Sequence, residues 1–469
     1  MNTTSPSPPS WADLLSGCNM LRSVALTGGV ALHAINVHIV TTILPSVVND
    51  IGGLEYYAWN ITLFVVASIL GSTLTAKLLD RLSPRLAYLL ALSVFTLGAV
   101  ACASAPSMGW MLAGRSVQGL GGGLLAALSY ALIRVVFAPP LWPRAVALVS
   151  GMWGVATLFG PAVGGLFAQS GHWRLAFWVL LPISLLQALV VMSQLPQQKK
   201  TGPATVRVPA LKITLLASSV LVIALAGLWP STAWKLGGVA FGLALGLLMA
   251  RLDQRAGVPL LPTGAYSLHS PMGKVFACIC LLMIGTTTEI YVPYFLQTLH
   301  GYTPLMAGYA TAAMAGGWSL ASLLTSSHSG AAAKRMVSTG PLVMTLSLTT
   351  LAVVLPGATG LPGPAQDLLM ILALAGAGFG VGQGWPHLVT RVLKSAAPGE
   401  ENLASSSITT VQLYAMAIGA ALAGLTANAA GLSEPGGVAG AQRAAYWLLG
   451  AFALAPTLAM LLTRKIVRS

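Results

Sequence analysis

Long apolar stretches, separated by short polar ones, run along almost the whole chain. A helix that crosses the hydrocarbon core of a bilayer needs about 20 mostly apolar residues. The stretches are continuously apolar, whereas a transmembrane β-strand would alternate apolar and polar positions. The pattern predicts an all-α polytopic membrane protein with fourteen spans, near residues 22–48, 56–78, 84–104, 108–136, 143–168, 174–193, 211–229, 233–250, 273–297, 304–326, 337–355, 367–393, 404–429 and 443–463.

Two longer polar breaks, at 194–210 and 251–271, divide the spans into groups of six, two and six. Two six-span halves with a substrate site between them near the membrane midplane are a common plan among secondary transporters. The sequence therefore predicts four regions: a cytoplasmic tail at 1–21, an N-terminal six-helix bundle at 22–193, a central segment with two additional transmembrane helices at 194–271, and a C-terminal six-helix bundle with a short cytoplasmic tail at 272–469.

Composition agrees with a membrane protein, and the position of the charges explains their sign. Of 469 residues, 56% are hydrophobic and only 7% are charged, against about 25% charged in soluble domains. The formal net charge is +14, from 24 Lys and Arg and 10 Asp and Glu residues. Most basic residues fall at span ends on one side, which marks that side and both termini as cytoplasmic. The charge thus follows from topology, and we expect no nucleic-acid partner.

The chain start and the cysteines add little chemistry. Residues 1–20 are polar and rich in Pro and Ser, so we expect a disordered tail. No charged segment with a cleavage site precedes the first apolar helix, which is expected to remain as an anchor. Cys278 and Cys280 form a Cys-x-Cys pair within an apolar run, but further ligands are lacking nearby. We expect no metal site and no cofactor.

The stretch GMWGVATLFGPAVGG, at 151–165, carries five glycines and a proline within a span. In a water-exposed helix Gly costs about 1 kcal/mol and Pro about 3 kcal/mol relative to Ala. Gly160 and Gly164 share one helix face and let a neighbouring backbone approach closely. Pro161 removes one backbone N–H and tends to kink the helix, which neighbouring helices make tolerable in a membrane. The stretch predicts a close, bent contact between helices.

This stretch resembles the fifth-helix antiporter motif of the major facilitator superfamily. The matching residues are Gly151, Gly160, Pro161, Gly164 and Gly165, and the resemblance extends over residues 20–465. The chain most resembles the fourteen-helix drug:proton antiporter branch. The resemblance implies the major facilitator fold and a conformational role for these five residues. The alternative is glycine-rich packing with no meaning for antiport.

Two further stretches resemble motifs of the same branch. GHWRLAFWVLLP, at 171–182, matches a Trp-Arg-x-x-Phe signature, although an Asn usual soon after it is absent; an aromatic belt with an interfacial Arg explains it equally. LAGRSVQGLGGG, at 112–123, resembles the fourth-helix motif, with Arg115 and Gln118 at matching positions. In the family such an arginine is linked to proton transfer or substrate binding. The alternative is an arginine that snorkels to the nearer interface.

AKLLDRLSPR, at 76–85, resembles the loop motif between the second and third helices. Asp80 and Arg81 match, and Arg85 stands in for another basic residue of a degenerate pattern. The resemblance implies a cytoplasmic gate that closes by charge pairing between Asp80, Arg81, Arg85 and neighbouring helix ends. The alternative is a solvated turn that follows the positive-inside rule.

INVHIVTTILP, at 35–45, resembles the first-helix motif of the branch, but Asn36 stands where an acidic residue is usual. An Asn side chain carries no titratable proton, which puts coupling through this position in doubt. His33 and His38 flank it, and histidine can titrate near neutral pH. Both histidines are therefore candidates for proton coupling; alternatively, each lines the pore or packs.

Glu289 is the one carboxylate deep within a predicted span, at a polar step after three threonines. A carboxyl group there can alternate between neutral and charged forms, so Glu289 is a candidate for proton coupling together with Arg115. The alternative is a residue at the extracellular end of a wide vestibule. For the substrate cavity the sequence offers Asn36, Gln118, Glu289 and Gln412.

These features predict a secondary active transporter, with proton-coupled efflux of amphipathic or cationic small molecules across the bacterial cytoplasmic membrane. The alternative is an uncoupled or symporting transporter for another small solute. A membrane enzyme is disfavoured, because clustered acid and base groups and a phosphate-binding loop are lacking, and a scaffold remains a remote alternative. Expected partners are a small-molecule substrate, protons and the lipid bilayer, with the protein acting as a monomer.

Overall fold

The computed structural model describes residues 11–197, 209–257, 259–357 and 359–468, and its regular elements are all helices. The first bundle is built from six long helices and several short ones. They are α1 (Trp11–Leu15), α2 (Gly17–Ile51), η1 (Leu54–Tyr56), α3 (Trp59–Arg81), α4 (Pro84–Ala103), α5 (Met108–Ala131), α6 (Ile133–Val136), η2 (Pro139–Leu141), α7 (Trp142–Gln169), α8 (Leu175–Trp178) and α9 (Leu180–Gln194).

Two helices, α10 (Ala210–Ala226) and α11 (Thr232–Gln254), then form a hairpin. The second bundle follows, and its first and last spans are each interrupted. Its elements are α12 (Pro271–Thr286), η3 (Thr287–Ile290), α13 (Val292–His300), α14 (Pro304–Thr325), α15 (Gly330–Val354), α16 (Gly363–Lys394), α17 (Glu401–Ala429), α18 (Gly437–Phe452) and α19 (Leu454–Arg468).

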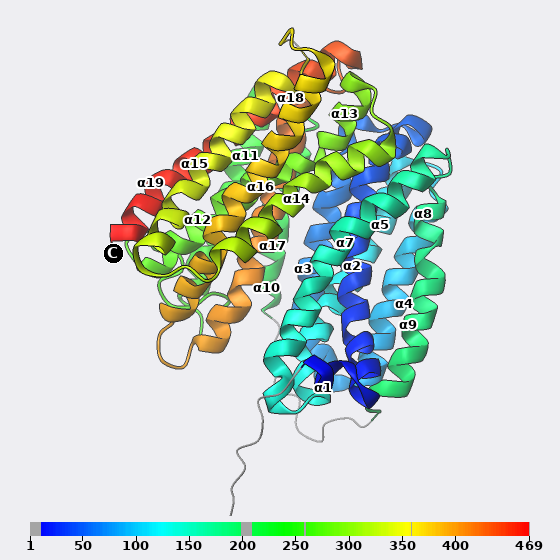
Figure 1. Ribbon diagram of the computed structural model, residues 1–469, viewed down its shortest axis with the longest axis vertical. Helices are drawn as coiled ribbons and strands as arrows, with labels where there is room; N and C mark the ends of the chain where they lie inside the picture. Colours follow the sequence, from blue (N-terminus) through cyan, green and yellow to red (C-terminus); the bar gives the residue numbers. More distant parts are fainter. Residues whose placement is uncertain (1–10, 198–208, 258, 358, 469) are drawn as a thin grey trace, which may run out of the picture.

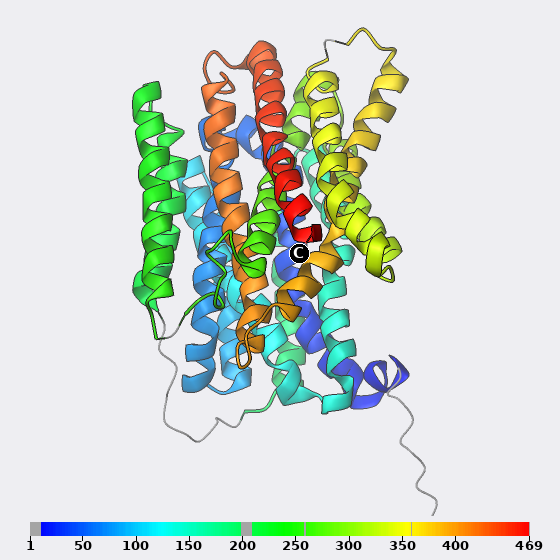
Figure 2. The same cartoon turned by 90° about the vertical axis from the view of Figure 1, so that its left-hand side faces the viewer.

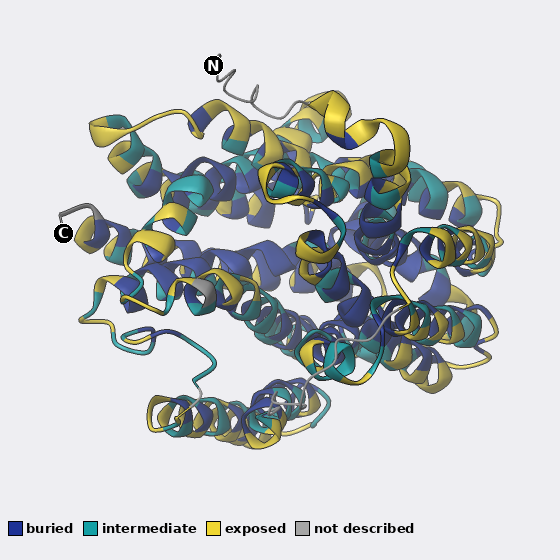
Figure 3. Ribbon diagram, turned by 90° about the horizontal axis from the view of Figure 1, so that it is seen from below, coloured by how far each residue is buried: buried dark blue, intermediate teal, exposed yellow. Residues whose placement is uncertain are grey.

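The surface of the helices suits a lipid environment. Eleven helices in the described part of the chain are long and apolar enough to cross a membrane, and α5, α10 and α14 stand at the other three predicted spans. Buried residues fill the interior of the bundles, and exposed ones face outward (Figure 3). Exposed side chains include Leu158, Leu186, Trp234, Leu236 and Leu323, at 63% to 76% exposure. The predicted all-α polytopic fold is confirmed.

The helices run alternately between two ends of the molecule. We call the end with the loops after α2, α4, α7, α10, α13, α15 and α17 the outer end, and the opposite end the inner end. The predicted topology puts the inner end in the cytoplasm. The two bundles lie against each other near the outer end, at the top of Figure 1, and diverge toward the inner end.

The start of the chain differs from the predicted disordered tail. Residues 11–15 are helical and α2 already begins at Gly17. Leu14 is fully buried, and its carbonyl accepts a hydrogen bond from Ser23 Oγ at 3.1 Å. Leu14 gives this short segment an apolar side chain to bury, which the polar composition concealed. Residues 1–10, and residues 198–208 of the first predicted break, lie outside the described residues.

The additional hairpin lies at the side of the molecule, next to α17 and α3 (Figure 2). Ser219 Oγ of α10 and Tyr414 Oη of α17 are hydrogen-bonded at 3.0 Å. Near the outer end a Cβ atom at Gly227 would lie 3.0 Å from Leu425 Cα, so α10 and α17 also approach closely there. The hairpin is therefore tied by polar and close apolar contacts to the second bundle.

A buried aspartate organises the chain after the hairpin. Asp253 has no exposed surface and pairs with Lys212 Nζ at 2.7 Å, so it joins α11 to α10. Its carboxylate also accepts hydrogen bonds from Leu260 N at 2.8 Å, Leu261 N at 3.2 Å and Tyr266 Oη at 2.8 Å. Burial, and then the Asp253 carboxylate, raise the pKa of Tyr266 well above its usual range, so Tyr266 stays a donor.

A second carboxylate connects this segment to the second bundle. The Glu400 carboxylate accepts hydrogen bonds from Thr263 N at 2.9 Å and from Thr263 Oγ1 at 2.7 Å. Glu400 immediately precedes α17, the helix that also binds the hairpin through Tyr414. The connection from the hairpin to α12 is thus held at the inner end of the second bundle.

Each bundle contains a central glycine-rich helix. In the first bundle this helix is α5, where added Cβ atoms at Gly119 and Gly123 would overlap backbone carbonyls of Phe64 and Ser68 on α3. On another side, Gly121 lies against the backbone of Phe95 on α4. Close approach of backbones through glycine is the usual way in which membrane helices pack tightly.

The counterpart in the second bundle is α16. Gly378 and Gly382 lie against the backbone of α14 at Met314 and Trp318, and a Cβ atom at Gly380 would come within 2.6 Å of the Gly340 carbonyl on α15. The alternate glycines of AGAGFGVGQGWP, at 375–386, therefore serve two neighbouring helices at once.

Candidate functional site

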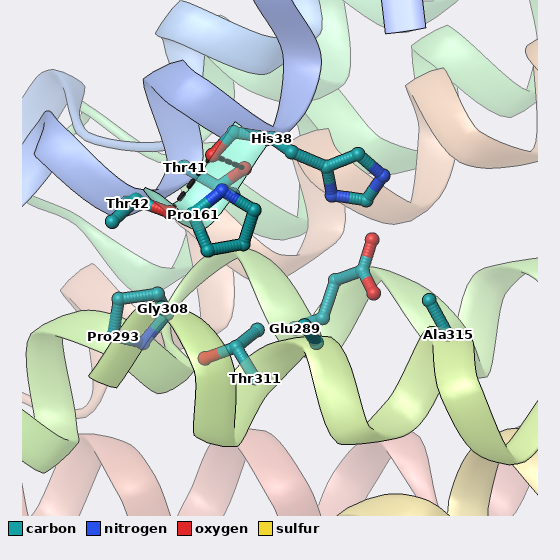
Figure 4. Close-up of a pocket in the computed structure, with 10 residues that line it drawn as sticks. His38, Thr41, Thr42, Pro161, Glu289, Pro293, Gly308, Thr311 and Ala315 are labelled. Atoms are coloured by element: carbon teal, nitrogen blue, oxygen red, sulfur yellow. Dashed lines mark hydrogen bonds between the residues drawn. The ribbon is translucent and has the colours of Figure 1, made fainter. Parts of the chain in front are cut away.

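A small pocket lies between the two bundles. Its walls come from α2 and α7 of the first bundle and from η3, α13 and α14 of the second. The carboxylate of Glu289 and the imidazole of His38 point toward one another in it (Figure 4). The lining residues are His38, Thr41, Thr42, Pro161, Glu289, Pro293, Gly308, Thr311, Ala312 and Ala315.

Glu289 lies in a break of the membrane helix rather than in regular α-helix. Pro293 has no N–H, and its ring conflicts with the carbonyl four residues earlier, which is that of Glu289. Thr287 Oγ1 and Thr288 Oγ1 donate to backbone carbonyls one turn back, at 2.6 Å and 3.0 Å. The chain therefore passes through the 3-10 turn η3 between α12 and α13, and the turn presents the Glu289 side chain to the pocket.

The Glu289 carboxylate forms no ion pair with any residue in the described part of the chain. Its side chain is partly exposed, so it is accessible from the pocket. An intramembrane carboxylate of this kind is expensive to keep and usually binds an ion, a proton or a substrate.

On the opposite wall, α2 contributes His38 together with two threonines. Thr42 Oγ1 donates to the His38 carbonyl at 2.8 Å, and Thr41 Oγ1 donates to the Val37 carbonyl at 2.6 Å. Both hydroxyl groups are thus occupied within their own helix, while the His38 side chain is partly exposed and free to face Glu289. The pocket brings together one histidine of the first bundle and one acid of the second.

The predicted close helix contact at 151–165 is present and involves two neighbours. A Cβ atom at Gly160 would overlap His38, and one at Gly164 would lie 2.9 Å from the Ile39 carbonyl, so α7 lies directly on α2. On another side, a Cβ atom at Gly165 would lie 2.6 Å from Leu305 Cα of α14.

The two ends of the motif differ. Pro161 lies within α7 and lines the pocket, and a Cβ atom at Gly308 of α14 would lie 3.1 Å from its ring. Gly151, the first residue of the motif, faces open space. The tight part of the motif is therefore the part beside the pocket.

Arg115 lies inside the first bundle, away from the residues that line the pocket. Its side chain is fully buried, which rules out snorkelling in this structure. Arg115 Nη1 donates to Gln118 Oε1 at 2.6 Å, Nε donates to the Asn60 carbonyl at 3.2 Å, and the guanidinium lies 4.0 Å from the centre of the Phe64 ring. Hydrogen bonds and a cation–π contact stabilise this charge without a carboxylate partner.

His33 and Asn36 belong to the same interior. The His33 ring is buried and stacks on Phe64 at 5.3 Å, beside Arg115. Asn36 has no exposed surface, and neither its amide nitrogen nor its amide oxygen has a hydrogen-bond partner among the described residues. The structure thus separates the candidates: Glu289 and His38 line the pocket, whereas Arg115, Gln118, His33 and Asn36 are buried within the first bundle.

Comparison with known proteins identifies the family. The family model described as Major Facilitator Superfamily matches residues 26–420. The chain belongs to the major facilitator superfamily. A relative from Mycobacterium tuberculosis named "Probable multidrug-efflux transporter" is 38% identical over 467 residues, covering 98% of this chain and 97% of its own length. The multidrug transporter protein MdtP of Bacillus subtilis is 25% identical over 411 residues, covering 82% of this chain and 72% of its own.

Solved structures of this superfamily share the fold. A D-xylose–proton symporter superposes with a TM-score of 0.65 at 14% identity, covering 96% of this chain and 98% of the symporter. A bacterial homologue of the lysosomal transporter Spinster gives a TM-score of 0.63 at 14% identity, covering 96% of this chain and 97% of its own. This major facilitator protein is therefore a multi-pass membrane transporter and not an enzyme.

The remaining candidates of this major facilitator transporter lie outside the pocket. Gln412 is partly exposed on α17. Asp80 and Arg81 end α3, and Arg85 follows the N-cap of α4. Arg85 Nε donates to the Leu195 carbonyl at 3.0 Å, which ties this loop to the inner end of α9 within the same bundle.

The transporter's Trp-Arg pair has a partner that the sequence did not reveal. Asp50, at the outer end of α2, accepts hydrogen bonds from Trp173 Nε1 at 3.1 Å and Arg174 Nη1 at 2.6 Å. Arg174 Nη2 also donates to the Ala105 carbonyl at 3.0 Å. Because Asp50 is far from the pair in sequence, only the fold brings the three together.

At the outer end, stacked tyrosines join the two bundles of the transporter. Tyr57, just before α3, stacks on Tyr291 of the second bundle at 4.9 Å and contacts Tyr294 edge-on at 5.6 Å. Beside them, Asn428 Nδ2 of α17 donates to the Glu55 carbonyl at 2.8 Å. Sequence reasoning missed this contact, because aromatic residues near span ends usually anchor helices in the interface.

Two further contacts join α7 to α14 of the transporter. Tyr309 Oη of α14 donates to the Leu158 carbonyl of α7 at 3.2 Å, at the depth of the pocket. Closer to the outer end, Leu305 lies on Gly165. The Leu305–Gly165 contact and the tyrosine stack therefore join the bundles on the outer side of the pocket. As for metals, no group of three or more His, Cys, Asp or Glu side chains within the described ranges could hold an ion.

Proposed function

We propose that this chain is a proton-coupled efflux transporter for amphipathic or cationic small molecules in the bacterial cytoplasmic membrane. One observation carries the proposal. The unpaired Glu289 carboxylate stands in a pocket between the two bundles and faces His38 of the opposite bundle. A group at that place can exchange a proton for a cationic substrate while both bundles sense its charge.

The direction of transport is inferred from relatives. The relative at 38% identity, aligned over almost its whole length, is named for multidrug efflux, and the Bacillus subtilis relative is named a multidrug transporter. Both relatives come from bacteria, in which an efflux protein of this kind lies in the cytoplasmic membrane. The pocket has a mixed character, with threonines, small residues and a single carboxylate, which suits amphipathic cations.

The mechanism that we propose is alternating access by rocking of the two bundles. With the outer contacts closed and the bundles diverging toward the inner end, the present conformation would load substrate from the cytoplasm. Rocking would then open the tyrosine stack and close the inner end. The glycine contacts of α7 with α2 and α14 border the pocket on both bundles and would serve as the pivot.

Coupling follows from competition at Glu289. An ionised Glu289 attracts a cation from the inner side, and a proton that arrives from the outer side neutralises the carboxylate and releases the cation. A ligand shifts the equilibrium between two conformations only by its different affinity for them. Proton and substrate must therefore exclude each other. His38 would hold or pass the proton, while Arg115 would keep a fixed charge within the first bundle.

The test uses proteoliposomes with an imposed pH gradient and an internal pH dye. Adding lipophilic cations should release protons in the wild type and not in Glu289→Gln, while the variant remains folded. The matched control is Glu55→Gln, a carboxylate of the outer loop. Unchanged proton release in Glu289→Gln would overturn the coupling assignment.

The same assay separates the alternative function. Asn36 replaces the acid that is usual in the resembling motif, and it lies buried without a polar partner. That observation favours a transporter that has lost coupling. Substrate movement without proton movement in the wild type would establish this alternative, and proton movement in the same direction as the substrate would establish symport.

A further inference from the structure

Two tryptophans of the second bundle, Trp318 on α14 and Trp385 on α16, lie nearer the inner end than the residues that line the pocket. Trp318 follows Thr311 by seven residues and Ala315 by three on α14, so it shares the helix face with which both residues line the pocket. Its indole meets that of Trp385 on α16 at 5.1 Å between ring centres and at 63°. Both side chains are partly exposed.

The lipid-facing side of α14 is a different one. Its exposed large apolar residues are Met306, Tyr309, Leu320, Leu323 and Leu324, at 44% to 76% exposure. Trp318 lies on the other side, next to Ser322, whose hydroxyl donates to the Gly382 carbonyl of α16 at 3.1 Å. Trp318 and Trp385 thus meet between α14 and α16, away from the lipid-facing side of α14.

Glycine packing sets the geometry of the pair. Because Gly382 lets the α16 backbone lie on the backbone of Trp318, the two helices are close enough for the indoles to meet edge to face. Two other aromatic pairs with tryptophan, Trp229 with Trp234 and Tyr446 with Trp447, contain strongly exposed rings, which suit contact with lipid or its interface. In the Trp318–Trp385 pair both rings are only partly exposed.

We infer that Trp318 and Trp385 form an aromatic platform that binds the rings of monovalent organic cations whose charge is held at Glu289. Aromatic rings gain from offset or edge contact with indole beyond the area that they bury. A cation near an indole face gains further from the ring quadrupole. One carboxylate at one end of an aromatic wall matches one positive charge attached to aromatic rings. The inference names the substrate class of the proposed function and rests on that function for the role of the pocket.

The test compares two probes of equal charge, tetraphenylphosphonium and tetrabutylphosphonium, of which only the first has aromatic rings. Binding of both is measured by calorimetry on the purified full chain in detergent, without a pH gradient. Trp318→Leu and Trp385→Leu should each weaken binding of the phenyl probe about tenfold, and of the butyl probe about twofold. Trp447→Leu, at an exposed ring pair, is the control and should change neither.

The ratio of the two affinities within one sample is the decisive quantity. Trp318→Phe and Trp385→Phe retain a ring and should lower the ratio less, which keeps the test available if a leucine variant fails to fold. Equal losses for both probes, or no loss, would overturn the inference. Glu289→Gln should weaken both probes together and keep the ratio. A protein that selects aromatic rings in detergent but moves no protons in vesicles would refute the coupling and leave the platform standing.

Discussion

The two bundles are packed alike around the glycine-rich helices α5 and α16, yet they place their intramembrane charges differently. Both helices use glycines to lie on the backbones of two neighbouring helices. In the first bundle, Arg115 of α5 is completely buried and is contacted by Gln118, Asn60 and Phe64. In the second bundle, Glu289 is left partly exposed at a helix break beside the pocket.

The difference teaches that close packing and charge placement are separate properties of this fold. Similar glycine contacts are found in the bundle that buries the Arg115 cation and in the bundle that leaves the Glu289 carboxylate accessible. A buried, hydrogen-bonded charge contributes to stability and specificity of packing, whereas an accessible unpaired one is available to ligands. Variants in the two bundles should therefore separate stability from transport.

The largest expected effect is on folding, and it should come from the glycine contacts that both bundles use. Gly119→Val and Gly382→Val would each push a side chain into a backbone carbonyl of the neighbouring helix, which cannot move aside. Overpacking of this kind costs roughly 1–3 kcal/mol or more, and we expect little monodisperse protein by size-exclusion chromatography. Gly154→Val is the control, because Gly154 faces open space on α7. Normal yield of both test variants would show that the helices are not held by these contacts.

An effect of intermediate size should distinguish the buried charge of Arg115 from the accessible charge of Glu289. Arg115→Lys loses the bond to the Asn60 carbonyl, the short bond to Gln118 and the stacking on Phe64. We expect a loss of about 2 kcal/mol in stability, seen as a lower midpoint of thermal unfolding, with transport per folded molecule retained. Glu289→Gln should do the reverse and keep the midpoint while it abolishes coupling. If Arg115→Lys keeps its midpoint and loses transport, Arg115 belongs to the transport site.

The smallest effect should come from Asn36. Both polar atoms of its amide lack a partner among the described residues, and the side chain has no exposed surface. Replacing an unsatisfied buried amide by an apolar group of similar shape is nearly neutral or slightly stabilising. Asn36→Leu should therefore change the unfolding midpoint little and leave substrate-driven proton movement intact. A strong loss of transport would place Asn36 in the substrate or proton pathway. It would then contradict the view that the buried polar groups of the first bundle serve stability alone.

Much of the fold could be read from the sequence because its signals are local. A span is recognised by a continuous apolar stretch, and the close contact of α7 follows from the spacing of Gly160 and Gly164 on one helix face. The helical start of the chain differs from the predicted tail, since a single turn such as α1 at Trp11–Leu15 is too short to stand out from a polar sequence.

The site was harder to read, because its contacts join distant segments. Glu289 and His38 were both candidates as single residues, but nothing in the sequence could say that they face one another or that Arg115 lies elsewhere. Pairings such as Tyr57 with Tyr291 depend on how two bundles meet. Periodicity within one helix contains no information about that meeting.

The stack of Tyr57 on Tyr291 also bears on the electrical insulation of the membrane. A bilayer stores an ion gradient only while no file of water molecules connects its two sides, because protons move rapidly along such a file. Both rings are fully buried and stacked, so they fill the outer mouth with carbon rather than water. A cell that carries many copies of this protein would thus keep its proton gradient while the copies wait, loaded or empty, in this conformation.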